Sequence, residues 1–99
     1  MDRLLQQLKE SVLCGDGAMG TLLAERGIPS GSCFEELCLS QPGKISEIHR
    51  EYLSAGAALL TTNSFGANTV KLASFGLQSR VAEINCAAAR HVRQAVDAS

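Results

Sequence analysis

The chain has 99 residues, of which 45% are hydrophobic, and a formal net charge of −1 at pH 7. This length allows one domain with a modest core, and the mixed charges leave no basic patch for nucleic acid. No apolar run approaches the ~20 residues of a membrane span, and the amphipathic start lacks the apolar core of a signal peptide. We therefore expect a cytoplasmic protein that binds neither nucleic acid nor membranes.

The first half of the chain predicts two helices, a strand and a long loop before a third helix. Residues 2–10 carry leucines on one stripe and predict a helix, residues 12–14 predict a short buried strand, and residues 18–25 predict a short helix. The Gly-, Ser- and Pro-rich stretch 28–43 predicts a loop with one helical turn at 34–37. Pro42 then lies in the first turn of a helix that runs to about Ala55 and stops at Gly56.

The second half predicts another buried strand followed by two helices. Residues 57–62 form the strand, residues 63–68 a polar loop, and residues 69–74 a short helix. The last helix runs to about Val96, with Ser79 as its N-cap. Apolar strands separated by helices are typical of a parallel sheet in an α/β protein. Because two strands alone leave open edges, we expect the front end of a larger barrel or sheet.

The cysteines and histidines give no sign of a reactive centre. Four cysteines form no CxxC pair and are interpreted as small hydrophobic residues, namely Cys14, Cys33, Cys38 and Cys86. His49 and His91 occupy helix positions that we expect to face outward or half-outward. Glu35 and Glu36 are interpreted as a solvated acidic pair at a helix start.

The segment Val12-Leu-Cys-Gly-Asp-Gly-Ala-Met-Gly-Thr21 is the strongest candidate for a binding site. Asp16 follows the first expected strand, and ligands of α/β proteins bind at the carboxyl ends of strands. Its carboxylate suits a substrate ammonium, while backbone N–H groups of the next turn suit a carboxylate. Thr62, Asn63 and Ser64 follow the second expected strand, which is the pattern of the catalytic face of a (β/α)8 barrel.

Two other interpretations of this segment remain open. The spacing of Gly15, Gly17 and Gly20 also fits a phosphate- or nucleotide-binding turn, although the second strand ends in Thr-Thr-Asn rather than in the acid of a dinucleotide fold. A non-enzymatic module that self-associates through its open strand edges is the third possibility.

Three motifs in order resemble the opening of the homocysteine S-methyltransferase domain. They are Asp16-Gly-Ala-Met-Gly-Thr21, Cys33-Phe-Glu-Glu-Leu37 and Ala55-Gly-Ala-Ala-Leu-Leu-Thr-Thr-Asn-Ser-Phe-Gly-Ala-Asn68. That domain begins cobalamin-dependent methionine synthases and a bifunctional form joined to a methylenetetrahydrofolate reductase module. The resemblance covers residues 12–96. It implies that residues 1–99 are the N-terminal portion, about two βα units, of a (β/α)8 TIM barrel.

The resemblance also implies an activity, the transfer of a methyl group to the thiolate of homocysteine. In that family a zinc ion, bound by three cysteine thiolates, binds the homocysteine sulfur. Those cysteines lie later in the family's domain, and none of the four here matches them, so we assign no metal ligand and no catalytic residue. We therefore expect this chain to be a fragment that is inactive alone. The resemblance further implies a methyl donor, with a folate among the candidates, and FAD where a reductase module follows.

The resemblance implies that a set of residues in this chain binds the amino-acid end of homocysteine. Asp16 matches the family's acid, and the resemblance implies that it takes the substrate ammonium. The substrate carboxylate is assigned to backbone N–H groups of Gly17, Ala18, Met19, Gly20 and Thr21. The loop after the second expected strand lines the same mouth and sets its shape, through Asn63, Phe65 and Asn68.

Overall fold

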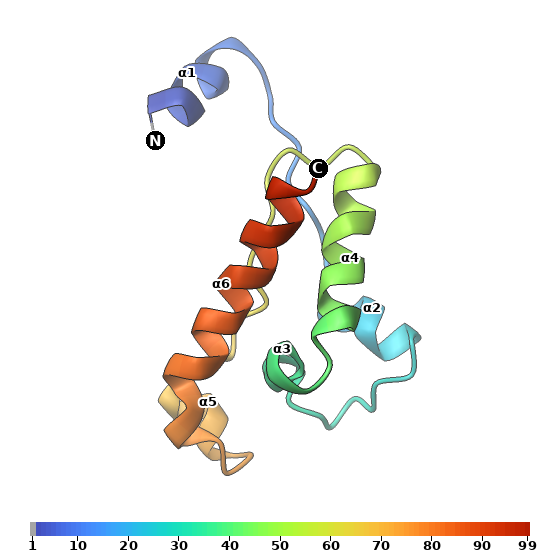
Figure 1. Cartoon of the computed structure of the whole chain (residues 1–99), viewed down its shortest axis with the longest axis vertical. Coiled ribbons are helices and arrows are strands. Elements are labelled where there is room, and N and C mark those ends of the chain that lie inside the picture. The colour runs from blue at the N-terminus through green and yellow to red at the C-terminus, as the bar shows by residue number, and fades with distance from the viewer. Residues whose placement is uncertain (1) are drawn as a thin grey trace.

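The computed structural model describes residues 2–99, and helices form most of it. The α-helices are α1 (Asp2–Glu10), α2 (Gly20–Glu25), α3 (Leu37–Ser40), α4 (Pro42–Ser54), α5 (Thr69–Ala73) and α6 (Val81–Asp97). Two short 3-10 helices, η1 (Phe34–Glu36) and η2 (Gln78–Arg80), precede α3 and α6. Figure 1 shows α4 and α6 as the two longest helices, with α3 near one end of the pair.

The expectation of an α/β fold, a portion of a TIM barrel, was wrong. The two segments expected as strands meet only at one isolated parallel bridge between Gly15 and Leu59, and no longer strand occurs among residues 2–99. Ala58 N–H donates to the Cys14 carbonyl at 2.7 Å, and Asp16 N–H donates to the Leu59 carbonyl at 2.9 Å.

The two segments do not form longer strands because their apolar side chains are not buried by other parts of the described chain. Val12 is 97% exposed and Leu59 is 40% exposed, so the apolar side chains that predicted buried strands are not buried. A lone parallel pair also has an unpaired edge on each side, and such a pair gains too little to extend. The described chain is therefore a helical assembly in which one backbone bridge brings two loops together.

The core lies where α3, α4 and α6 pack on one another. One cluster joins α2, α3, α4 and α6 through buried side chains that include Leu23, Leu37, Ile45, Ile48 and Ala88. A second, smaller cluster lies beside it and contains Cys33, Ala67, Leu72 and Ile84. Helix α1 buries none of its residues and projects from the rest of the molecule (Figure 1). The core therefore supports the loops that precede α2 and α5.

Local signals predicted most helix limits correctly. Helix α4 begins at Pro42 and ends at Ser54, and Gly56 follows with a φ of 107°, a left-handed conformation that favours glycine. The predicted helical turn at 34–37 extends into α3. Ser79 does not act as an N-cap, because it lies within η2 and no side chain caps α6.

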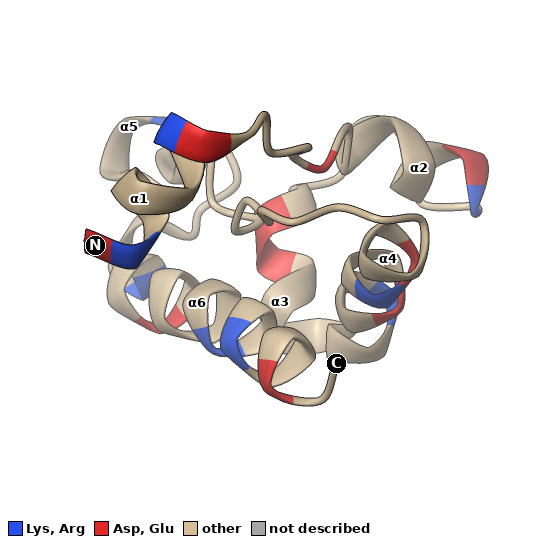
Figure 2. Ribbon diagram, turned by 90° about the horizontal axis from the view of Figure 1, so that it is seen from above, with Lys and Arg blue, Asp and Glu red and all other residues tan. Residues whose placement is uncertain are grey.

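Charged residues are distributed over the helices rather than gathered in one segment of the ribbon (Figure 2). Arg26, just after α2, forms a bidentate ion pair with Glu51 of α4, with N–O distances of 2.6 and 2.8 Å. This pair ties α2 to α4, although exposed ion pairs of this kind add little stability. None of the helices within residues 2–99 has the length and apolar character to cross a membrane.

His49 and His91 are buried, contrary to the expectation that they face outward. His49 of α4 is 0% exposed and His91 of α6 is 7% exposed. His91 continues the helical spacing of the buried Ile84 and Ala88, so the apolar stripe already contained the signal. Within the described chain, neither ring nitrogen of His49 has a hydrogen-bond partner, and neither does Nδ1 of His91.

We expect these histidines to make the fold less stable in acid. Burial lowers the pKa of both imidazoles in the folded chain, with Asp16 partly opposing the shift at His49 and Arg90 adding to it at His91. The unfolded chain therefore takes up protons first, at its ordinary histidine pKa of about 6.5. The free energy of unfolding should fall as the pH drops from about 6.5 toward the lowered folded-state values.

Urea unfolding between about pH 8 and pH 5 measures this loss. The double variant His49→Gln/His91→Gln should show a flatter dependence over the same range. An equal slope in both proteins would contradict the assignment to these two side chains.

Candidate functional site

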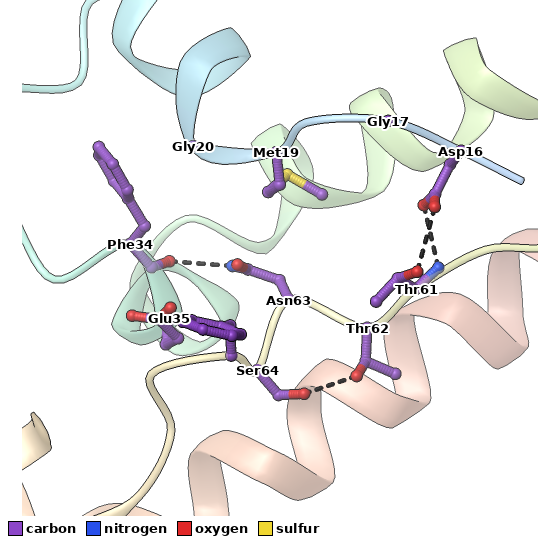
Figure 3. A pocket seen from close by; sticks show the side chains of 11 residues that line it. Asp16, Gly17, Met19, Gly20, Phe34, Glu35, Thr61, Thr62, Asn63 and Ser64 are labelled. Atoms are coloured by element: carbon purple, nitrogen blue, oxygen red, sulfur yellow. Dashed lines mark hydrogen bonds between the residues drawn. The ribbon is translucent and has the colours of Figure 1, made fainter. Parts of the chain in front are cut away.

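A cavity of about 390 Å³ lies between the turn before α2, the start of η1 and the loop after Leu60 (Figure 3). Its volume is within the range of small-molecule sites. The lining residues come from all three segments: Asp16, Gly17, Met19, Gly20, Phe34, Glu35, Thr61, Thr62, Asn63, Ser64 and Phe65. The bridge between Gly15 and Leu59 holds two of these segments together directly beside the cavity.

Asp16 is held in place by Thr61. The Thr61 N–H donates to Oδ2 at 2.9 Å, and the Thr61 hydroxyl donates to Oδ1 at 3.1 Å (Figure 3). Asp16 does not cap α2, whose start has no side-chain cap. Each carboxylate oxygen has two lone pairs, so both oxygens keep a free position for a ligand donor.

The glycines of the turn are explained by neighbouring side chains of the chain itself. A Cβ at Gly17 would lie 3.0 Å from the Tyr52 hydroxyl oxygen, and a Cβ at Gly20 would lie 3.3 Å from the Phe34 ring. Tyr52 also donates its hydroxyl hydrogen to the Ala18 carbonyl at 2.7 Å. These contacts fix the turn against α4 and η1, and account for glycine at both positions without any bound phosphate.

Asn63 connects the loop to the η1–α3 segment. It is buried, and its amide donates to the Phe34 carbonyl at 2.9 Å and to Cys38 Sγ at 3.5 Å. Asn68 caps α5 by accepting a hydrogen bond from the Lys71 N–H at 2.8 Å. Phe65 lines the cavity mouth with its side chain 100% exposed. The two asparagines thus shape the loop, while Phe65 is free to meet a ligand.

The structure brings most of the expected site residues together. Those that line the cavity are Asp16, Gly17, Met19, Gly20, Asn63 and Phe65. Ala18, Thr21 and Asn68 do not line it. Thr61 was not singled out from the sequence, since its role depends on a bridge between segments far apart in the chain.

Glu35 is the main residue that sequence reasoning missed. It was expected to be a solvated acid, yet it lines the cavity and its Oε2 accepts a hydrogen bond from the Gly66 N–H at 3.1 Å. The sequence feature that pointed to Glu35 as a site residue was its place within the motif Cys33-Phe-Glu-Glu-Leu37. The cavity therefore has two carboxylates, and its lining residues include no Lys, Arg or His.

The cysteines of the chain do not fit a metal centre. Cys33 and Cys38 are buried while Cys14 and Cys86 are exposed, and no three His, Cys, Asp or Glu side chains within residues 2–99 are placed to hold one ion. Burial raises the pKa of the Cys38 thiol to about 11, so it stays protonated at neutral pH. Because these side chains are not grouped around a common point, we assign no zinc ligand to the described residues.

Comparison with known proteins shows which family the chain resembles. The profile of the homocysteine S-methyltransferase family matches residues 13–99. The chain is 36% identical over 90 residues to the methionine synthases of Mycobacterium leprae and Mycobacterium tuberculosis. Each alignment covers 83% of this chain but only 7% of the relative, so the chain spans a small part of the length of these curated relatives.

Proposed function

The chain belongs to the homocysteine S-methyltransferase family, and from this premise we propose that its cavity binds the amino-acid end of homocysteine. The matched residues 13–99 include all three segments that line the cavity. We accordingly propose that they act as one homocysteine-binding unit.

The observation that carries this proposal is the Asp16 carboxylate in a cavity without a lining cation. Asp16 lines the cavity, and its negative charge favours an ammonium group. Asp16 is fixed by Thr61 and is our assigned acceptor for the substrate ammonium. The backbone N–H groups of Gly17, Met19 and Gly20, which line the cavity, are assigned to the substrate carboxylate as hydrogen-bond donors.

The apolar part of the cavity suits the rest of homocysteine. Met19, Phe34 and Phe65 line it and offer apolar surface to the methylene groups of the substrate side chain. Asn63 and Asn68 act on the substrate through the shape of the loop, since both are engaged in hydrogen bonds within the chain.

We propose methyl transfer to homocysteine as the activity of the complete protein. The sulfur lone pair of the homocysteine thiolate forms the new S–CH3 bond, and the electrons of the old bond leave with the donor. This chain binds and orients the substrate but supplies no zinc ligand and no catalytic group, so we expect it to be inactive alone. The methyl donor, whether a folate or another, and any FAD-containing reductase module would be provided outside these residues.

The phosphate-binding alternative is opposed by the same charges. A phosphate would face two carboxylates with no lining Lys or Arg to offset them. Helix α2 has only 6 residues, and the close approach of Tyr52 to Gly17 and of Phe34 to Gly20 explains these two glycines. The site therefore favours a zwitterionic amino acid over a phosphate.

Isothermal titration of the chain with L-homocysteine and three comparison ligands tests the proposed function. The ligands are 4-mercaptobutanoate, which lacks the ammonium, 3-aminopropanethiol, which lacks the carboxylate, and inorganic phosphate. We expect each thiol analogue to bind at least about tenfold more weakly than homocysteine, because each loses one charge-assisted contact. Tighter binding of phosphate, or equal binding of 4-mercaptobutanoate, would contradict the proposal.

A further inference from the structure

We propose that Glu35 is a positioning residue that holds residues 63–66, here called the wall loop, as one side of the cavity. This inference rests on the proposed function, because it assigns how the homocysteine site keeps its shape. The Glu35 carboxylate and the Gly66 N–H are 31 residues apart in sequence and 3.1 Å apart in space. The carboxylate therefore links η1 directly to the far end of the wall loop.

The lack of a side chain at Gly66 leaves room for this carboxylate. A Cβ at this position would lie 3.1 Å from both Glu35 oxygens and 3.1 Å from Cγ of Lys71. Any side chain there would push the carboxylate or the loop aside. The absence of a side chain lets Glu35 sit against the backbone of the loop, where its charge strengthens the hydrogen bond.

The near end of the wall loop has its own anchor on the same segment. Asn63 donates to the Phe34 carbonyl, and the Cys38 thiol donates to the Asn63 carbonyl at 3.6 Å. Phe65 lies between the two anchors and is fully exposed, so packing does not hold it. The position of Ser64 and Phe65 at the cavity therefore depends on the anchors at Asn63 and Gly66.

The rival role for Glu35 is direct capture of the substrate ammonium by its charge. The two roles need different properties of the side chain. Positioning needs an oxygen acceptor for the Gly66 N–H, which glutamine also supplies through its amide oxygen. Ammonium capture needs the negative charge, which glutamine lacks. Comparison of Glu35→Gln with Glu35→Ala therefore separates them.

The test uses the whole 99-residue chain and two readouts, the exchange rate of the Gly66 amide hydrogen and the affinity for L-homocysteine. For Glu35→Ala, we expect Gly66 exchange to rise about tenfold and homocysteine affinity to fall about tenfold, because a charge-assisted hydrogen bond is lost. Glu35→Gln should stay within about threefold of the unaltered chain on both readouts. Glu36→Ala is the matched control, since Glu36 lies next in η1 but bonds Ser40 instead, and it should change neither readout.

A second pair of variants covers the case in which Glu35→Ala fails to fold. Gly66→Ala should weaken homocysteine binding, whereas Gly31→Ala should not, because a Cβ at Gly31 meets nothing within 4 Å. The proposal is overturned if Glu35→Ala leaves Gly66 exchange unchanged, or if Glu35→Gln loses as much affinity as Glu35→Ala. If the unaltered chain binds no homocysteine, the proposed function fails, while Gly66 exchange still tests the anchor separately.

Discussion

Asp16→Asn is expected to weaken homocysteine binding by about 10- to 100-fold, the cost of losing a charge-assisted contact. The asparagine keeps the size of the side chain but removes the negative charge offered to the ammonium. It also replaces one carboxylate oxygen with an NH2 group, which cannot accept the hydrogen that Thr61 donates at that position. Isothermal titration with L-homocysteine measures the change.

Two further variants separate the effect of the Asp16 charge from the effect of the hydrogen bonds that Thr61 donates to it. Thr61→Val removes the hydroxyl bond to Oδ1 but keeps the backbone bond to Oδ2, so we expect only about a threefold loss of affinity. Asp2→Asn removes an exposed carboxylate on α1, away from the cavity, and should leave binding unchanged. Unaltered binding by Asp16→Asn would contradict the role of Asp16 in holding the ammonium.

Leu72→Ala is expected to lower the free energy of unfolding by about 2–5 kcal/mol, the usual cost of a cavity at a buried leucine. Leu72 of α5 is 0% exposed and packs with Cys33, Ala67 and Ile84 in the smaller core cluster. This cluster joins α5 and α6 to the segment that precedes η1. The variant should therefore loosen the support of the wall loop along with the fold, since domains of this size have only about 5–15 kcal/mol of stability.

Val70→Ala provides the matched control for this variant. Val70 lies two positions earlier on the same helix and is 86% exposed, so its truncation should change the stability by no more than about 0.5 kcal/mol. Urea unfolding followed by circular dichroism gives both values. Equal destabilisation by the two variants would contradict the burial that the structure assigns to Leu72.

The helices could be predicted from the sequence because their signals are local. Pro42 at the start of α4 and Gly56 after its end are recognisable without any partner. The strands were predicted wrongly because apolar runs indicate burial, and burial depends on what covers the segment. Val12 and Leu59 are apolar, yet no described element covers them. The histidines show the opposite error, since their polarity outweighed their place on an apolar stripe.

The candidate site was predictable where a motif carried it and not where a long-range contact did. Asp16 and the turn after it were found from the glycine spacing and the resemblance. Glu35 was interpreted as solvated because its partner is a backbone N–H at Gly66, which no side-chain pattern reveals. Thr61 was missed for a similar reason, since the bridge to Gly15 brings it to Asp16.

The most direct test of the central claim is a titration of the 15N-labelled chain with L-homocysteine, followed at each backbone amide. The account predicts saturable shift changes at Gly17, Met19 and Gly20 and at residues 61–65, which line two sides of the cavity, and none along α1. Changes confined to other surfaces, or no saturable change at all, would contradict the assignment of this cavity to homocysteine.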